Sequence, residues 1–239
     1  AEMIPNALKA RWSEGKATLN GWLSIGDPFS AEIMAAQGYD SLTVDLQHGF
    51  HDLPGVLAMI QAIQAAGVVP LARVNWNEPG MVMKLLDAGA LGVICPMIES
   101  RRQCESFVGA CRYPPEGYRS LGPTRAKPVC GEQCAEQANR ETLAVAMVET
   151  VAGLNALEEI LSVDGLSGVF IGAGDLRLSL AASGETTTLE DGVARILDAS
   201  RRAGVWAGIF TTDPEEGRRR ITQGFQFLTV KTNGQLLSD

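Results

Sequence analysis

The sequence has no continuous apolar run of the roughly 18 residues that a membrane-spanning helix needs, so we expect no membrane association. It opens without a basic leader followed by an apolar segment, and no secretory signal is predicted. Its five cysteines are an odd number in a chain of 239 residues, unlike the disulfide framework of a small secreted protein. Together these features predict a cytoplasmic protein.

Positive charge is scarce as well, because 20 Lys and Arg residues stand against 28 Asp and Glu residues, for a formal net charge of -8. An acidic surface repels phosphate backbones, so we expect no nucleic-acid partner. The composition is otherwise ordinary for a globular protein, with 46% hydrophobic and 20% charged residues. A chain of this length can bury one large core, and we expect a single domain over residues 1–239.

Repetition dominates the pattern along the chain. Short apolar runs predict eight strands, at 19–25, 41–46, 68–74, 92–98, 144–150, 168–173, 206–210 and 227–232. Amphipathic segments between them predict helices, among them 30–38, 52–67, 78–90 and 153–163. Eight apolar strands that alternate with helices predict an α/β fold, a closed (β/α)8 TIM barrel. A doubly wound open sheet is disfavoured, because the sequence contains no GxGxxG motif.

Two segments depart from this regular pattern. The connection 99–143 is long and rich in Pro, Gly and Arg, which predicts an ordered surface loop. Its Arg119 and Arg125 either bind a second substrate or a neighbouring subunit, or are solvated, whereas 218–220 is an Arg run that we expect on an exposed helix face. Only seven residues follow the last strand, so we expect the eighth helix to be truncated or exchanged with a partner, and a homo-oligomer to cover the bare barrel wall.

Chemically active side chains fall at the carboxyl ends of the predicted strands, where the catalytic groups of such barrels stand. The set comprises Trp22, Asp45, Gln47, His48, Arg73, Glu149, Asp175, Phe210 and Lys231. Burial makes a charge costly unless it is paired or bound to a metal. Glu149 and Asp175 supply two hard oxygen ligands, which suit Mg²⁺ or Mn²⁺ and leave positions for water and a chelating substrate. The alternative is that Glu149 caps the next helix and Asp175 is an ordinary turn residue.

Only two histidines are present, and both lie just after the second predicted strand. Side chains alternate along a strand, so Asp45 and His48 meet only if the chain turns after about Leu46, and Gly49 is consistent with that turn. An Asp that holds a His fixes its tautomer and raises its basicity, which suits proton transfer near neutral pH. We interpret His51 as a surface or interface residue, with an HxxH metal pair left open.

Six motifs follow one another in a specific order, namely GWLSIGDPFSAEIMAAQGYDSLTVDLQHG, PLARV, MVMKLLDAGALGVICPMIES, YPPEGYRSLGP, MVET and IGAGDL. With them the chain resembles the class II pyruvate aldolases of the HpcH/HpaI family, and among these the bacterial hydroxyketoacid aldolases. The resemblance covers nearly the whole chain. It implies a (β/α)8 barrel that binds Mg²⁺, Mn²⁺ or Co²⁺ and forms or cleaves aldols of a 2-oxoacid, pyruvate or hydroxypyruvate, with aldehydes through an enolate. It also implies a hexamer, a trimer of dimers that exchange their C-terminal helices.

The resemblance also assigns roles to the residues at the strand ends. Glu149 and Asp175 match the two metal ligands of the family. Arg73 matches the guanidinium that contacts the keto oxygen of the substrate. Asp45 and His48 match the acid–base pair, which moves protons to and from the aldol hydroxyl.

Further positions match residues that surround the family's substrate. The backbone N–H groups of Gly174 and Asp175 match those that receive the substrate carboxylate. Asp87 matches a carboxylate that reaches a metal-bound water in a neighbouring subunit. Trp22 and Phe210 match positions that line the aldehyde side of the site.

Three positions depart from the commoner family pattern. Gln47, which we place among the substrate-binding residues, replaces a Glu, and Met147 replaces a Gln. Gly174 replaces the Ala of the commoner GPADL motif. These changes put the donor preference and the proton route in doubt, while every proposed metal ligand is retained.

Three alternatives to the metal-dependent aldolase remain open at this point. Lys231 lies at a strand end and is a candidate Schiff-base nucleophile, although a salt bridge at the barrel end is the plainer reading. A related metal-dependent acyl-thioester lyase needs room for a bulky thioester. A barrel that only binds a 2-oxoacid would show no enolisation.

Overall fold

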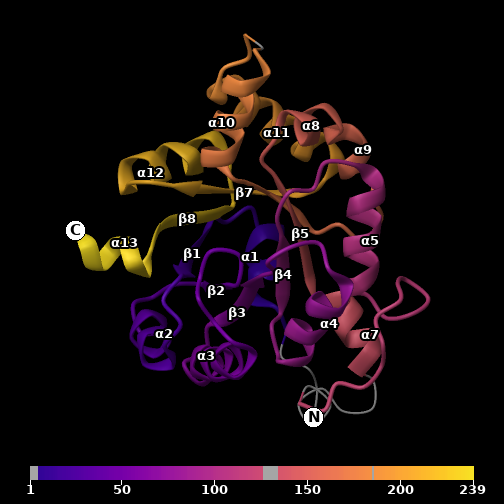
Figure 1. Ribbon diagram of the computed structural model, residues 1–239, viewed down its shortest axis with the longest axis vertical. Helices are drawn as coiled ribbons and strands as arrows, with labels where there is room; N and C mark the ends of the chain where they lie inside the picture. Colours follow the sequence, from indigo (N-terminus) through magenta and orange to yellow (C-terminus); the bar gives the residue numbers. More distant parts are fainter. Residues whose placement is uncertain (1–4, 126–133, 185) are drawn as a thin grey trace.

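The computed structural model describes residues 5–125, 134–184 and 186–239. Its eight parallel strands close into a barrel in the order β1 to β8 (Figure 1). The strands are β1 Thr18–Leu23, β2 Ser41–Asp45, β3 Val69–Arg73, β4 Gly92–Cys95, β5 Leu143–Val148, β6 Gly168–Ile171, β7 Trp206–Thr211 and β8 Phe227–Thr232. Each overlaps one of the eight predicted strands, so the prediction of a (β/α)8 barrel is confirmed.

Helices surround this barrel and connect its strands (Figure 1). They are α1 Ala7–Ser13, α2 Pro28–Ala35, α3 Leu53–Ala65, α4 Pro79–Asp87, α5 Arg101–Cys111, α7 Cys134–Glu141, α8 Val151–Asn155, α9 Leu157–Leu161, α10 Ala173–Ser183, α11 Leu189–Ala203, α12 Pro214–Gln223 and α13 Asn233–Ser238. Several begin where an Asp side chain accepts a hydrogen bond from the first turn and a Pro follows, as Asp52 does before α3. None of the helices described is both long and apolar enough to cross a membrane.

Three predicted element boundaries are wrong, each for a local reason. The helix expected at 30–38 starts at Pro28, because the Asp27 side chain caps it. The helix expected at 153–163 is two short helices, α8 and α9, that meet at Ala156. The strand expected to reach residue 98 ends at Cys95, because Met97 takes a left-handed conformation with a φ of 55° and leaves the ladder.

The buried apolar residues form two shells, because side chains alternate between the two faces of each strand. One cluster fills the inside of the barrel, with Trp22, Leu71, Val145, Phe170 and Phe227 among its members. The other packs the outer faces of the strands against the helices. This alternation also decides which side chains at the strand ends point into the barrel.

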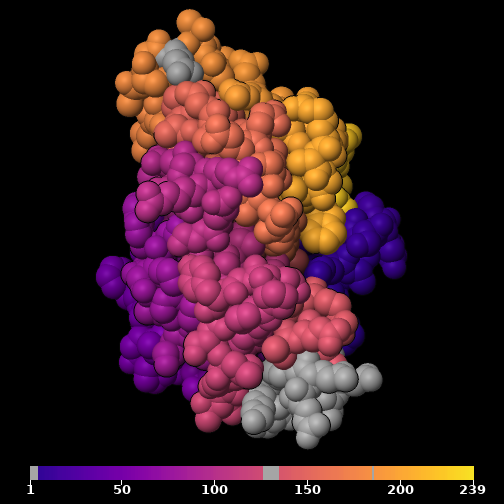
Figure 2. Space-filling model, turned by 90° about the vertical axis from the view of Figure 1, so that its right-hand side faces the viewer, coloured from indigo at the N-terminus to yellow at the C-terminus, as the bar shows by residue number. Residues whose placement is uncertain are grey.

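The helix α1, which the sequence analysis did not predict, closes one end of the barrel. It is the indigo projection at one side of Figure 2. Its Trp12 ring lies 5.1 Å from the ring of Trp206 and 5.3 Å from that of Phe227, measured between centroids. Asn6 caps α1 and donates to the carbonyls that precede β4 and β5. The end that α1 closes is the amino-terminal one, so the carboxyl ends of the strands form the mouth.

The last helix of the described chain, α13, is six residues long and follows β8 directly. Asn233 at its start is buried and accepts hydrogen bonds from the backbone of Ser24 and Ile25, just after β1. Leu237, near its end, is exposed. Figure 1 shows α13 pointing away from the barrel.

The described part of the long connection is ordered by arginines rather than solvated. Arg119 is 4% exposed and donates to Asp87, and its guanidinium lies 4.5 Å from the centroid of the Tyr113 ring. Arg125 donates to the carbonyl of Ala88 and to the side chain of Gln64. The solvated reading of both residues is therefore wrong, and 126–133 lies outside the described residues.

One member of the predicted exposed arginine run is buried. Arg220 is 1% exposed and forms two hydrogen bonds of 2.7 Å with Glu190 of α11, besides contacting Glu216. The expectation that the whole run is exposed is wrong at this position. An α-helix has about 3.6 residues per turn, so three consecutive residues point in three different directions around the helix, and one of them can face inward.

We expect Arg220→Met to lower the free energy of unfolding by about 1–3 kcal/mol, because it leaves two carboxylates without their shared donor. Arg218→Met changes an exposed side chain on the same helix and serves as the matched control, with a change of about 0.5 kcal/mol or less. Equilibrium urea unfolding measures both. Equal effects of the two substitutions would contradict the proposed stabilising role of the Arg220 contacts with Glu190 and Glu216.

Candidate active site

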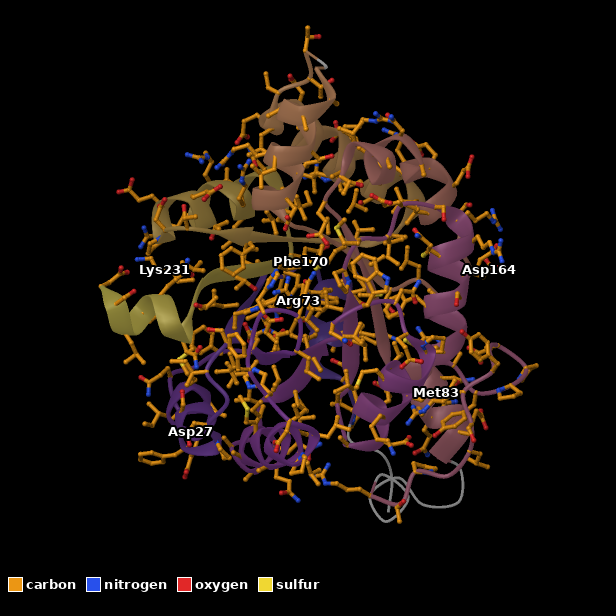
Figure 3. The ribbon with its side chains drawn as sticks, viewed as in Figure 1. Asp27, Arg73, Met83, Asp164, Phe170 and Lys231 are labelled. Atoms are coloured by element: carbon orange, nitrogen blue, oxygen red, sulfur yellow. The ribbon has the colours of Figure 1, made fainter. Side chains whose placement is uncertain are left out.

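The ends of neighbouring strands bring most of the predicted residues to the mouth of the barrel. Asp45 and Arg73 are direct partners in the register of β2 and β3, so their side chains point to the same side of the sheet. Glu149 follows β5, and Asp175 lies in the first turn of α10 after β6. Figure 3 shows Arg73 and Phe170 near the centre of the barrel, which is where this group gathers.

Asp45 and Arg73 form a buried ion pair with two parallel hydrogen bonds. The Nε atom of Arg73 donates to Oδ1 over 2.8 Å, and its Nη2 atom donates to Oδ2 over 2.6 Å. Burial alone would raise the pKa of Asp45, but the hydrogen bonds and charge of Arg73, with the bond from Trp22, outweigh it and hold this pKa below its ordinary value. The carboxyl group of Asp45 is therefore ionised at neutral pH.

The chain turns after Leu46, as predicted, but the turn does not pair Asp45 with the imidazole of His48. Oδ1 of Asp45 accepts the backbone N–H groups of Gln47, over 3.0 Å, and of His48, over 3.4 Å. With Arg73 and Trp22 these donors occupy both oxygens, and in the described chain the His48 ring is not among their partners. The predicted carboxylate–imidazole bond is wrong, because Asp45 is committed to Arg73.

The other histidine, His51, joins two connections at the mouth. Its Nε2 atom lies 3.3 Å from the carbonyl oxygen of Leu23. The ring packs so closely against Gly26 and Gly49 that a Cβ at either glycine would overlap it. His51 is therefore half-buried between the β1–α2 and β2–α3 connections and does not stand free on the surface, whereas its expected place at an interface stays a prediction.

Glu149 is the most confined carboxylate at the mouth, with 1% of its surface exposed. Its Oε1 atom accepts the backbone N–H of Met97 over 2.8 Å. A Cβ at Gly172 would come far inside 3.0 Å of Oε2, so only glycine leaves room for this carboxylate. The side chain of Thr150 caps α8, which makes the alternative of Glu149 as the helix cap wrong.

Burial and the nearby charge of Asp175 both disfavour the ionised form of Glu149. Burial is the main cause that raises its pKa to about 7, with a smaller contribution from the charge of Asp175, whereas the hydrogen bond from the Met97 N–H and the charge of Arg73 act in the opposite direction. Two carboxylates that repel each other at a confined place fit a divalent cation, which removes the repulsion. Across the described ranges no three His, Cys, Asp or Glu side chains form a fuller metal cage, so any cation here would rest on these two and on outside ligands.

The turn before α10 leaves backbone donors open. Gly172 occupies the N-cap position, and no side chain caps the helix. Asp175 is exposed in the first turn, and a Cβ at Gly174 would meet nothing within 4 Å. The first N–H groups of a helix have no partner within it, and their dipole favours an anion. This helix start is therefore open to a carboxylate.

Trp22 and Phe210 lie at different depths. Trp22 is 2% exposed and lies under the Arg73 guanidinium, whose carbon atom is 4.8 Å from the centroid of the indole ring. Phe210 is half-buried and meets the indole edge-on, with 5.9 Å between ring centroids. Of the two, Phe210 is the one partly open to solvent.

Two predicted residues lie apart from this group within one chain. Asp87 is the last residue of α4, whereas the residues at the mouth lie beyond the first residue of that helix. The Asp87 carboxylate accepts a 2.7 Å hydrogen bond from Arg119. Lys231 has a φ of 62° and pairs with Asp239. Figure 3 places Lys231 at the outer side of the molecule, away from Arg73. The plainer reading of Lys231 as a salt-bridge residue is confirmed.

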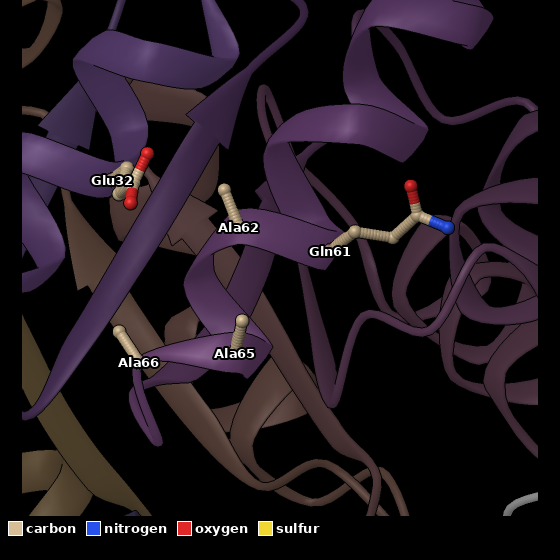
Figure 4. Close-up of a pocket in the computed structure, with 5 residues that line it drawn as sticks. All are labelled: Glu32, Gln61, Ala62, Ala65 and Ala66. Atoms are coloured by element: carbon tan, nitrogen blue, oxygen red, sulfur yellow. The ribbon is translucent and has the colours of Figure 1, made fainter.

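A separate cavity of about 420 Å³ lies on the outside of the barrel (Figure 4). Residues of α2, α3 and the α3 C-cap line it, namely Glu32, Gln61, Ala62, Ala65 and Ala66. None of the predicted site residues is among them. Its small apolar lining offers one carboxylate and one amide, so it does not belong to the active site.

Sequence reasoning missed two residues that shape the site. Met97 turns its N–H onto Glu149 through a left-handed backbone, and no residue pattern announces this, because Met rarely adopts it. Gly172 leaves room for the same carboxylate. The first glycine of IGAGD, Gly172, was a visible signal in the sequence, because a glycine at a strand end often marks a place where another group packs closely against the backbone.

Known proteins resemble this chain over nearly its whole length. Residues 20–239 match the family described as HpcH/HpaI aldolase/citrate lyase. The chain is 37% identical over 237 residues to a hydroxypyruvate/pyruvate aldolase of Rhizorhabdus wittichii, which covers 98% of this chain and 94% of the relative. It is 32% identical to a 4-hydroxy-2-oxo-heptane-1,7-dioate aldolase of Klebsiella pneumoniae, over 98% of this chain and 90% of that one.

A solved structure of the same family also resembles this chain. The crystal structure of an HpcH/HpaI aldolase/citrate lyase family protein from Burkholderia cenocepacia has a TM-score of 0.90 and 31% identity, and the match covers 97% of this chain and 95% of that one. The two relatives named above are aldolases, and this chain is an enzyme of the aldolase and lyase kind. The chain belongs to the HpcH/HpaI aldolase/citrate lyase family.

Proposed function

We propose that this enzyme forms and cleaves aldols of pyruvate or hydroxypyruvate with aldehydes, and that it depends on a divalent metal ion. The observation that carries the proposal is the buried carboxylate of Glu149, which faces the charge of Asp175 and lies near Arg73. The names of the relatives, among them a hydroxypyruvate/pyruvate aldolase, support the choice of substrates.

Glu149 and Asp175 would hold the metal ion. Their hard oxygen atoms suit Mg²⁺ or Mn²⁺, with Co²⁺ as a further candidate, and two protein ligands leave positions open for a chelating 2-oxoacid. When bound, the cation would polarise the keto group and stabilise the negative charge of the enolate. Because Gly172 has no side chain, the Glu149 carboxylate can occupy the space directly beside it.

Arg73 supplies a positive contact to the keto oxygen. Its Nε and Nη2 atoms are committed to Asp45, whereas Nη1 has only the weak acceptor Sδ of Met147, at 3.9 Å. Nη1 is thus the part of the guanidinium that remains for substrate. A donor fixed in advance at the oxygen where charge develops favours the transition state.

The substrate carboxylate binds at the start of α10. The N–H groups of Gly174 and Asp175 point out of an uncapped helix end, which favours an anion. Phe210 and Gln47 lie on the side of the second substrate. The buried Oε1 atom of Gln47 has no hydrogen-bond partner among the described residues, so it is free to accept one from a hydroxyl group.

His48 moves protons to and from the aldol hydroxyl. Its backbone is held by Asp45 while its ring stays unengaged by that carboxylate. Asp45 therefore contributes by holding Arg73 and the turn rather than by orienting the imidazole. An imidazole titrates close to neutral pH, which suits exchange of a proton in both directions.

Several broader expectations belong to the same proposal. We infer that 1–239 forms one domain, that the enzyme acts in the cytoplasm and that it assembles as a hexamer, a trimer of dimers. In that assembly Asp87, held by Arg119, would complete the site of a neighbouring subunit. The exposed Leu236 and Leu237 of α13 are apolar and suit an interface.

We expect removal of divalent metal with a chelator to abolish aldol cleavage, and Mn²⁺ or Mg²⁺ to restore it, because the enolate charge then lacks its counterion. Exchange of the C3 protons of pyruvate in deuterated water, followed by NMR, reports the same enolisation without an aldehyde. Full activity of the metal-stripped protein would refute metal dependence. Binding without any exchange would indicate a barrel that only binds a 2-oxoacid.

Gly172→Ala is expected to weaken Mn²⁺ binding at least about 10-fold, because the new Cβ displaces the Glu149 carboxylate. Gly174→Ala is the matched control, since its Cβ meets nothing within 4 Å and its N–H is retained. Electron paramagnetic resonance of free Mn²⁺ measures both affinities. Unchanged binding in the Gly172 variant would place the metal elsewhere.

Substitution of His48 by Ala should lower kcat by about 10²–10⁴-fold, because the proton of the aldol hydroxyl loses its partner. Mn²⁺ affinity, measured as above, should stay at the wild-type value, since this ring holds no metal in the proposal. His51→Ala is the control for losing a histidine from the same connection. Loss of Mn²⁺ binding on replacement of His48 would make it a metal ligand and contradict its role.

A further inference from the structure

Trp22 contacts both members of the buried ion pair. Its indole ring lies 4.8 Å from the guanidinium carbon of Arg73, and its Nε1 atom donates to Oδ2 of Asp45 over 3.1 Å. The same oxygen accepts Nη2 of Arg73 over 2.6 Å. One side chain therefore supports the face of the cation and also binds the anion.

The position of Trp22 follows from the register of the barrel. In the pairing of β1 with β2, Trp22 is opposite Thr43, and Asp45 lies two residues farther along β2 on the same face. Trp22 thus belongs to the layer directly beneath the Asp45–Arg73 pair. A layer of inward-facing side chains is what fills a barrel of eight strands.

Other aromatic rings prevent the indole from tilting. Phe170 stacks on it with 5.6 Å between ring centroids and an interplanar angle of 27°, and Phe210 meets it edge-on. Phe227 in turn packs against Phe170, with 5.4 Å between centroids. Figure 3 labels Phe170 and Arg73, the two residues that contact the indole, near the middle of the barrel. The platform under the guanidinium is therefore rigid.

Among the described residues, the other contacts of Arg73 fix the tilt of its guanidinium plane less firmly than the indole does. The two bonds to Asp45 lie along one edge of the group and leave rotation about that edge. On the other side, the Met147 sulfur accepts only weakly from Nη1, at 3.9 Å. An aromatic face that attracts the cation opposes this rotation.

We propose that Trp22 is a positioning residue, which fixes the plane of the Arg73 guanidinium and aims Nη1 at the oxygen of the substrate. The inference rests on the proposed function, in which Arg73 contacts the keto oxygen of a 2-oxoacid. Trp22 acts through Arg73 rather than on substrate, because it lies in the layer beneath the ion pair and contacts both of its members. Its loss lowers kcat more than it changes KM, since the aimed contact strengthens as charge develops.

A double-mutant cycle tests this coupling. Trp22→Phe keeps a ring on the platform but loses the Nε1 bond, and Trp22→Leu loses both contacts. In the wild-type background we expect kcat to fall about 10-fold or more for Trp22→Leu, and less for Trp22→Phe. In an Arg73→Lys background, which has no planar guanidinium to orient, the same substitutions should lower kcat by about 2-fold or less.

Trp12→Phe is the matched control, because Trp12 is a buried tryptophan at the closed end of the barrel whose Nε1 donates to Thr18. Its effect on kcat should be the same in both backgrounds. If the Trp22 substitutions also cost the same factor in both backgrounds, Trp22 is only a packing residue and the proposal is overturned.

Crystal structures of the Trp22 variants provide a second readout that requires no catalysis. We expect the Arg73 guanidinium to turn away from its present plane in Trp22→Leu, with Trp22→Met, which also removes the aromatic face, as the substitute if the Leu variant does not fold. An unmoved guanidinium overturns the proposal. Because this readout stands even if the wild-type enzyme lacks aldol activity, failure of the proposed function and failure of this inference remain distinguishable.

Discussion

The ion pair between Asp45 and Arg73 organises the mouth of the barrel. Two charges buried at a strand end are costly unless they meet with good geometry, and here both oxygens of the carboxylate are fully engaged. Three consequences follow from this one contact. The guanidinium keeps Nη1 outside the ion pair, the turn that carries His48 is held through its backbone, and Trp22 gains two partners in place of one.

The other half of the mouth has the opposite electrostatic character. Glu149 is buried without an ion-pair partner of its own, and the charge of Asp175 makes its ionised form still less favourable. Met97 and Gly172, which the chain brings from two different connections, hold its carboxylate in one place. In the proposed function, a satisfied pair beside an unsatisfied carboxylate would accept a cation without disturbing the residues that orient the substrate.

Much of the fold was predictable, because it depends on local patterns. Each of the eight strands is a short apolar run, and their common carboxyl ends bring Asp45, Arg73 and Glu149 together whatever the details of the loops. The failures share a cause. The buried Arg220, the wedged His51 and the committed oxygens of Asp45 each depend on a partner distant in sequence or on a turn whose exact path no pattern specifies.

By itself, the sequence determined the barrel, the family and the set of residues at its mouth, because strand periodicity, turn glycines and ordered motifs are all written along the chain. Only the tertiary structure decided how those residues pair. Hydrogen bonds saturate, and a carboxylate that accepts from a guanidinium, an indole and two backbone N–H groups has no acceptor position left for an imidazole. Which partner wins depends on register and distance between strands, and these exist only once the barrel has closed.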